Sequence, residues 1–160
     1  MDFIWSPWRY DYLASGGVKA PSCVFCVGED RTHDAERLIV FRGTHNFIIL
    51  NLFPYTSGHL MVAPYEHLDT IVSAKADQLT EMMQLSQKSI AVLQKLYRAD
   101  GFNLGMNLGS AAGAGVREHF HLHVVPRWIG DASFMTIVGE TRVLPEELQK
   151  TYERVKAELR

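Results

Sequence analysis

Long apolar runs are missing from this chain. None of its segments approaches the roughly 18 consecutive apolar residues that a membrane-crossing helix needs. The first residues, Met1-Asp2-Phe3-Ile4-Trp5, lack the basic and apolar regions of a signal peptide. A strong charge of either sign is also missing, because the formal net charge is only −2, which provides no basic surface for nucleic acid or anionic membrane. We therefore expect a cytoplasmic protein that binds neither.

Cysteine is scarce as well. The two cysteines are spaced as Cys23-Val-Phe-Cys26, and in a reducing compartment this spacing indicates metal binding or redox chemistry rather than a structural disulfide. A tetrahedral zinc site would take the two thiolates and two further ligands. A redox dithiol is one alternative, although the sequence around the pair lacks a thioredoxin-like βαβ pattern. Two buried thiols without a function are the other.

Repeats and low-complexity segments are absent too, and 160 residues with 47% hydrophobic side chains suffice for one domain, 1–160, with a proper core. Apolar periodicity predicts an α+β domain, a roughly five-stranded antiparallel sheet with one long helix and a C-terminal helix. The expected strands are 38–41, 47–50, 59–63, 102–108 and 119–127, with a short additional strand at 134–138. The expected helices are 73–98 and 144–159, the second with Pro145 in its first turn. Residues 1–22 form an aromatic-rich arm.

What the chain does contain is a run of alternating histidines, His119-Phe-His121-Leu-His123. Alternation with a period of two is typical of a half-buried strand, so the three imidazoles would share one face while Phe120, Leu122 and Val124 point into a core. Packing does not explain a strand face made of imidazoles, which serve near neutral pH as nucleophiles, proton donors, phosphate contacts or metal ligands. We interpret this stretch as the centre of the chemistry. The alternative is a chance cluster of histidines on a solvated strand.

A loop of small residues, Gly109-Ser-Ala-Ala-Gly-Ala-Gly115, comes directly before these histidines. Such a loop lets backbone N–H groups converge on an anion because no side chain is in the way. It lacks the Gly-Lys-Ser/Thr of a Walker loop, so it does not predict the magnesium site of that motif. Its position before the histidines favours phosphate binding over a simple turn.

Together these motifs resemble the histidine-triad (HIT) superfamily, whose pattern is His-x-His-x-His followed by apolar residues. The resemblance covers nearly the whole chain, including Gly58-His59-Leu-Met-Val-Ala-Pro64 and the run from Asn107 to Gly115. The opening Trp5-Ser-Pro-Trp-Arg-Tyr10 and the tail from Pro126 to Pro145 are similar to the diadenosine tetraphosphate phosphorylase-like (nucleotide adenylyltransferase) branch. The resemblance implies a HIT-like fold and a homodimer.

The resemblance also implies roles for individual residues. At the matching motif positions, His121 would form a covalent nucleotidyl-histidine, and His123 and His59 would contact the phosphate oxygens and the leaving group. Asn107 would support the phosphate site, and Asn51 would contact the ribose hydroxyls with an amide where many members carry Asp. The α-phosphate would bind to the loop residues Gly109, Gly113, Ala114 and Gly115.

A structural zinc ion is a further implication of the resemblance. In the zinc-bearing members, the ligands besides the two cysteines are the histidine that follows Pro-x-x after the third strand and the first histidine of the triad. The implied ligands here are Cys23, Cys26, His67 and His119. The triad would then divide its work, with His119 on zinc and with His121 and His123 on phosphate.

We therefore expect an enzyme, a nucleotidyl hydrolase or transferase that cleaves an adenosine nucleotide at its α-phosphate; the resemblance favours a dinucleoside polyphosphate such as diadenosine tetraphosphate. Many triad hydrolases carry Gln-Ser or Gln-Thr where this chain has Gly115 and Val116. The loss of these side-chain donors favours inorganic phosphate over water as the acceptor. Two alternatives remain open. One is a metal-dependent hydrolase in which the three strand histidines bind one catalytic metal, and the other is a nucleotide-binding module with little turnover.

Overall fold

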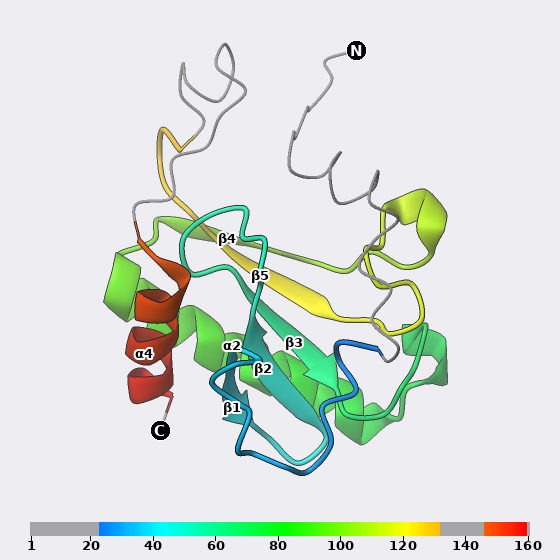
Figure 1. The fold of residues 1–160 in the computed structure, drawn as a ribbon. Helices are drawn as coiled ribbons and strands as arrows, with labels where there is room; N and C mark the ends of the chain where they lie inside the picture. The colour runs from blue at the N-terminus through cyan, green and yellow to red at the C-terminus, as the bar shows by residue number, and fades with distance from the viewer. Residues whose placement is uncertain (1–22, 132–145, 160) are drawn as a thin grey trace.

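A five-stranded antiparallel sheet organises the chain (Figure 1). The computed structural model describes residues 23–131 and 146–159, so the predicted arm 1–22 and the short strand at 134–138 lie outside the described residues. The strand order is β1-β2-β3-β5-β4, which confirms the α+β prediction. The strands are β1 (Ile39–Arg42), β2 (Asn46–Leu50), β3 (Leu60–Pro64), β4 (Gly101–Gly105) and β5 (Leu122–Arg127).

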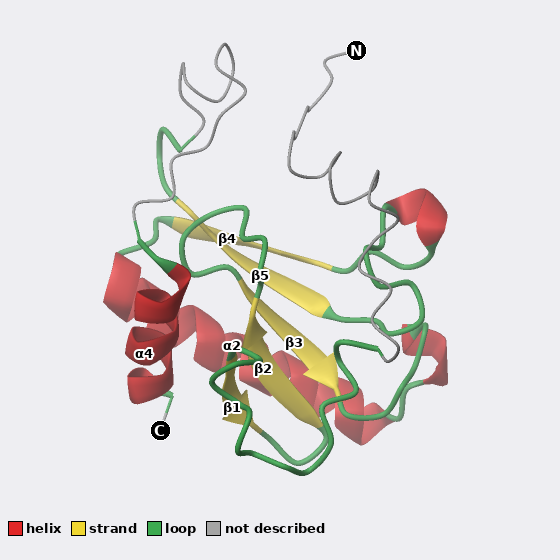
Figure 2. Ribbon diagram, in the orientation of Figure 1, coloured by secondary structure: helices red, strands yellow, loops and turns green. Residues whose placement is uncertain are grey.

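Two helices, α2 (Ala76–Tyr97) and α4 (Leu148–Glu158), cover one face of this sheet (Figure 2). Helix α2 packs against β2, β3 and β5, and α4 packs against α2 and β1. Neither helix, nor any other within the described ranges, has the length and apolar character required to span a bilayer.

Strand alternation divides the apolar side chains between the two faces. The helix side holds the larger core, to which β2, β3 and β5 contribute Ile48, Leu50, Leu60, Val62, Leu122 and Val124. Phe120 joins the same core, as the histidine pattern predicted. The opposite face carries a smaller cluster made of Phe25, Val27, Ile39, Phe47, Ile49, Met61 and Ala63. His123 alternates with Leu122 and Val124, so it lies on that opposite face.

The predicted start of the histidine strand was wrong. Strand β5 begins at Leu122 rather than at His119. The physical reason is that the Phe120 N–H donates to the Leu68 carbonyl over 2.7 Å instead of joining the sheet ladder. The first two histidines therefore run alongside the segment after β3. Strand β4 ends at Gly105, which pairs with His123, rather than at residue 108.

Two helix starts also differ from the prediction. Residues Ile71–Ser73 form a separate 3₁₀ turn, η1, capped by Thr70, and α2 begins only at Ala76, where the Gln78 side chain accepts the Lys75 N–H at 2.8 Å. Helix α4 begins at Leu148 rather than at residue 144, and the predicted place of Pro145 in a first turn lies outside the described residues. Glu146, just before this helix, accepts hydrogen bonds from Tyr97, Thr151 and Arg154.

Candidate active site and metal centre

One ring nitrogen of His121, Nδ1, makes a hydrogen bond to the main chain, and the other, Nε2, does not take part in that bond. Its Nδ1 lies 3.1 Å from the carbonyl oxygen of His119, and because a carbonyl only accepts, Nδ1 carries the proton and Nε2 keeps a lone pair. The Phe25 ring packs against it with centroids 4.6 Å apart. Burial lowers the pKa of His121, against the smaller raising effect of the carbonyl bond. The imidazole is therefore neutral, which is its nucleophilic form.

His123 lies beside His121, with ring centroids 4.8 Å apart in an edge-on arrangement. Its Nδ1 is 2.9 Å from Nε2 of His59, and His59 Nδ1 in turn accepts the main-chain N–H of Tyr55 over 3.1 Å. Burial, followed by the neighbouring His123 and His121, lowers the pKa of His59 to about 3. Burial and His121 lower the pKa of His123 to about 4. Both rings are neutral at physiological pH.

His59 lies against His123. The ring is fully buried and its Nε2 is 2.9 Å from Nδ1 of His123. Its contact with a phosphate stays a prediction. Asn51 belongs to the same group, since its Nδ2 lies 3.4 Å and 3.5 Å from the two ring nitrogens of His59 while its Oδ1 accepts the Phe53 N–H at 2.9 Å.

The small-residue loop folds back on itself. Residues Ser110–Ala112 form a 3₁₀ turn, η2, flanked by Gly109 and Gly113 at φ values of 79° and 80°, which glycine adopts at little cost. The Gly113 N–H donates to the Ser110 carbonyl at 3.0 Å, and the Ala114 N–H donates to the Gly109 carbonyl at 3.3 Å. These two amides are therefore used within the loop, unlike the anion-facing amides that the sequence predicted. Asn107 is half-buried between β4 and this loop.

The four residues expected to bind zinc lie together. The Sγ of Cys23 is 3.5 Å from His119 Nδ1, and the Sγ of Cys26 is 3.3 Å from His67 Nδ1 and 3.9 Å from His119 Nδ1. All four candidate ligand atoms lie within 4.8 Å of one another. Zinc bonds of about 2.3 Å to sulfur and about 2.0 Å to nitrogen would span such a group in a tetrahedral arrangement.

The surroundings of these four residues also fit a metal. His119 Nε2 lies 2.8 Å from the Pro64 carbonyl, so Nε2 carries the proton and Nδ1 directs its lone pair towards the cysteines, as a metal-bound histidine requires. Burial, and then the adjacent Cys23, raise the pKa of the Cys26 thiol. A divalent cation reverses such a shift because coordination deprotonates thiols. The donor set therefore suits zinc.

Comparison with known proteins identifies the family of this site. The HIT domain family matches residues 32–128, a range that contains all five strands of the sheet and the three alternating histidines of the motif. The chain belongs to the HIT family. It is 42% identical over 154 residues to an AP-4-A phosphorylase from Mycobacterium tuberculosis strain H37Rv. The match covers 92% of this chain and 79% of that relative.

Two other proteins extend the comparison. A bis(5'-adenosyl)-triphosphatase from Dictyostelium discoideum is 28% identical over 56% of this chain and 59% of its own. Among solved structures, a Zn-bound histidine triad family protein from Mycobacterium smegmatis superimposes with a TM-score of 0.68 at 29% identity, covering 87% of this chain and 94% of the other.

Two residues of the HIT site escaped the sequence analysis. Phe25 packs on both His119 and His121, with centroids 5.4 Å and 4.6 Å away; its place inside the Cys-x-x-Cys motif was the available signal. Tyr55 contributes through its main chain, for which a side-chain pattern holds no signal. Neither residue could be found from periodicity.

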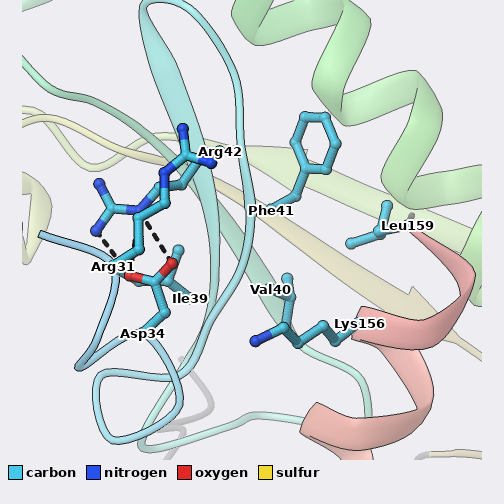
Figure 3. A pocket seen from close by; sticks show the side chains of 8 residues that line it. All are labelled: Arg31, Asp34, Ile39, Val40, Phe41, Arg42, Lys156 and Leu159. Atoms are coloured by element: carbon cyan, nitrogen blue, oxygen red, sulfur yellow. Dashed lines mark hydrogen bonds and ion pairs between the residues drawn. The ribbon is translucent and has the colours of Figure 1, made fainter. Parts of the chain in front are cut away.

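A separate cavity of about 260 Å³ lies between β1, the preceding loop and α4 (Figure 3). It is lined by Arg31, Asp34, Ile39, Val40, Phe41, Arg42, Lys156 and Leu159. None of these is a predicted residue of the HIT site, and Arg42 there forms an ion pair with Asp34 at 2.7 Å. The cavity is thus apart from the triad.

Proposed function

We propose that this HIT protein cleaves dinucleoside polyphosphates at the α-phosphate through a covalent nucleotidyl-His121 intermediate, with diadenosine tetraphosphate as the favoured substrate. The observation that carries the proposal is the 3.1 Å contact from His121 Nδ1 to the His119 carbonyl, which fixes the proton on Nδ1 and leaves Nε2 to attack phosphorus. The relative named AP-4-A phosphorylase, 42% identical to this chain, supports the substrate class.

The neighbours of His121 supply the remaining contacts of the reaction. His123 stands beside the nucleophile and donates a hydrogen bond to the phosphate oxygens as charge develops, while His59 holds His123 from behind. Asn107 supports the phosphate and Asn51 contacts the ribose. The proposed phosphate-binding loop keeps Gly109, Gly113, Ala114 and Gly115, although the N–H groups of Gly113 and Ala114 donate within the loop, so phosphate would have to displace these two hydrogen bonds or bind through other groups of the loop.

Cys23, Cys26, His67 and His119 would hold a structural zinc ion. When bound, a zinc ion with four protein ligands contributes folding energy and not Lewis-acid catalysis. The chain's own contribution is His119, whose ring faces the cysteines while its carbonyl holds His121. The ligand set thereby orients the nucleophile.

The ring directions speak against a single catalytic metal bound by all three histidines. His119 Nδ1 faces Cys23, His121 Nδ1 faces a carbonyl, and His123 Nδ1 faces His59. Because His119 Nε2 also faces the Pro64 carbonyl, His119 has no nitrogen left for an ion that His121 and His123 could share through their Nε2 atoms.

We also propose inorganic phosphate as the acceptor, which gives ADP and ATP from diadenosine tetraphosphate. Gly115 and Val116 offer no side-chain donor to orient a water. Arg117, two residues before His119, is exposed, so its charge is accessible to an approaching anion.

One experiment tests the function directly. The protein is incubated with diadenosine tetraphosphate, with and without inorganic phosphate, and both the products and any acid-labile adduct on His121 are identified. ADP with ATP, formed only with phosphate and through the adduct, is the expected result. AMP at equal rates in both conditions would refute phosphorolysis. Binding without turnover would leave a nucleotide-binding module instead.

We further propose a homodimeric, cytoplasmic protein. Within the described residues β4 pairs only with β5, and it carries the 40% exposed side chain of Leu104. Such an edge strand is a template for pairing with a second chain. Light scattering on the purified protein should give the mass of two chains, and the mass of one chain would rule the dimer out.

A further inference from the structure

The cavity beside β1 combines apolar and charged lining residues (Figure 3). Half of its lining is apolar and consists of Ile39, Val40, Phe41 and Leu159. Val40 and Leu159 belong to the larger core, whereas Ile39 belongs to the smaller cluster on the opposite face of the sheet. The cavity therefore reaches apolar side chains of both clusters at the β1 edge of the sheet.

The one carboxylate of the lining, Asp34, is neutralised by Arg42. Nη2 of Arg42 lies 2.7 Å from Asp34 Oδ1, and both side chains are largely buried. Nη1 of Arg42 donates to the Gly28 carbonyl at 2.7 Å, and Nη2 also donates to the Asp30 carbonyl at 3.2 Å. Asp34 and Arg42 thus form a fixed, neutral wall of the cavity.

The other two charged residues of the lining, Arg31 and Lys156, are both cations. Within residues 23–131 and 146–159, neither forms an ion pair with a carboxylate. The Lys156 ammonium donates to the Tyr152 hydroxyl at 2.6 Å, which leaves two of its three N–H groups for another acceptor. Arg31 comes from the loop before β1 and Lys156 from α4, so two separate elements bring positive charge to one cavity.

A third cation, Lys88, lies beside the apolar lining. Its Nζ is 3.7 Å from the centroid of the Phe41 ring and donates to the Leu159 carbonyl at 2.8 Å. Positive charge therefore surrounds an apolar surface whose one carboxylate is already paired. Such a cavity is complementary to an anion that also carries an apolar group.

The main chain of β1 is irregular where it lines the cavity. The pairing register with β2 shifts between Ile39 and Phe41, so Val40 is the extra residue of a β-bulge. Leu38, two residues earlier, has a φ of 62°, which is uncommon for a residue with a side chain. Bulges and strained residues are enriched next to ligand sites, and here both occur in the strand that forms the cavity.

We propose that this cavity is a second binding site, for a small organic anion with an apolar group, such as a medium-chain carboxylate. Arg31 and Lys156 bind the anionic head, and the apolar group packs against the β1 and α4 side chains. Because one water takes roughly 30 Å³ in the liquid, a volume of about 260 Å³ suits a ligand of about nine or ten non-hydrogen atoms.

The cavity and the triad are far enough apart to be occupied together. Strands β1 and β5 are separated by β2 and β3, which places them roughly 14 Å apart at the usual spacing of neighbouring strands. Binding at the cavity therefore does not require an empty nucleotide site. The inference goes beyond the proposed function and does not depend on it.

Titration of the full chain with octanoate tests the site directly. Ile39, Val40 and Leu159 carry methyl groups in the lining, and methyl NMR should show saturable shifts at these three residues, with a Kd that is roughly millimolar or tighter. Shifts that do not saturate, or that miss all three residues, would overturn the inference. This measurement on the wild-type chain stands whether or not any variant folds.

Two matched compounds separate the two parts of the ligand. Octanamide has the same chain without the charge, and acetate has the same charge without the chain. Each should bind about 10-fold more weakly than octanoate or worse, because one loses the charged hydrogen bonds and the other loses the buried apolar surface. Equal affinity of octanamide and octanoate would contradict the role of the cations, and equal affinity of acetate would contradict the role of the apolar lining.

Competition with AMP shows which site the octanoate occupies. A saturating concentration of AMP should leave the Kd of octanoate unchanged, since the two ligands bind at opposite sides of β2 and β3. Displacement of octanoate by AMP would mean that it binds at the triad, and the inference would fail while the proposed function remained.

Charge variants test the two cations. Arg31→Gln and Lys156→Gln should each weaken octanoate binding about 10-fold and leave octanamide binding unchanged. Lys150→Gln is the matched control, because it removes the same charge from an exposed position of the same helix that does not line the cavity. The same octanoate affinity in all three variants would overturn the assignment of Arg31 and Lys156.

Discussion

The rings of His121 and His123 have centroids 4.8 Å apart, yet their protons lie on different nitrogens. His121 donates through Nδ1 to a carbonyl, whereas His123 accepts through Nδ1 from His59. Nε2 thus carries a lone pair on His121 and an N–H on the neighbouring His123. The pair is complementary to a phosphoryl group, with phosphorus facing the lone pair and oxygen facing the donor.

Replacement of the nucleophile is the first prediction. His121→Ala should lose turnover by several orders of magnitude, as loss of a covalent nucleophile does, while AMP still binds because the loop and Asn107 are unchanged. Turnover of diadenosine tetraphosphate and AMP affinity are measured on the same preparation. His33→Ala is the matched control, since that exposed histidine forms an ion pair with Glu36 outside the triad. A variant that keeps a tenth of wild-type activity would exclude the covalent mechanism.

Among the elements, the sequence predicted which side chains of the strands are buried more accurately than it predicted the residues at which the strands begin and end. The period-two pattern of Phe120, Leu122 and Val124 gave the buried face correctly, because burial of alternate side chains is a local property. The start of β5 was wrong because the Phe120 N–H bonds to Leu68, a contact between distant segments that no local pattern contains. The four metal-binding candidates came from family motifs, and the structure brings them within 4.8 Å.

The tautomer of His59 is the feature of the site that the sequence could least predict. It depends on where the peptide N–H of Tyr55 points, and every residue except proline carries that group. The use of amides within the loop, as at Ala114, has the same cause. Main-chain direction follows from tertiary structure and not from residue type.

The zinc ligands give the second prediction. Protein prepared without chelator should contain about one zinc per chain by elemental analysis, and Cys26→Ser should lose it together with a few kcal/mol of stability. For a chain of this size, each kcal/mol corresponds to roughly 2–4 °C in Tm. His45→Ala, at a half-buried histidine outside the cluster, serves as the control for histidine loss. Metal-free protein with unchanged stability would refute the zinc site.

The loop before the triad gives the third prediction. Gly115→Gln with Val116→Ser restores side-chain donors at the two positions where the chain lacks them, so products from diadenosine tetraphosphate should shift from ADP with ATP towards AMP with ATP. Chromatography of the products measures the ratio. Val116 packs against the Phe25 cluster, so Gly115→Gln with Val116→Ala is the control that loses the same packing without gaining a hydroxyl. Equal product ratios in both double variants would refute the role of the hydroxyl.

For the whole molecule, the buried histidines couple stability to pH. The folded pKa values of His59 and His123 are about 3 and about 4, below the value of about 6.5 in an unfolded chain. Between these limits the unfolded chain binds more protons, so the free energy of unfolding is fully present above about pH 6.5 and decreases as the pH falls. At pH 5 the loss should be roughly 2 kcal/mol for each histidine, which is about 1.5 pH units at 1.36 kcal/mol per unit.

Urea unfolding at pH 7.5 and pH 5 tests this dependence, which is the last prediction. His59→Gln keeps an N–H donor for His123 but has no group that titrates in this range. The variant should be less stable than the wild type at pH 7.5, because the shape of the buried ring is lost, and yet it should lose roughly 2 kcal/mol less between the two pH values. The difference between the two chains cancels contributions that they share, including those of the Cys/His cluster. An identical loss in both would mean that His59 is protonated in the folded protein as readily as in the unfolded chain, and that the neutral, hydrogen-bonded pair with His123 does not exist.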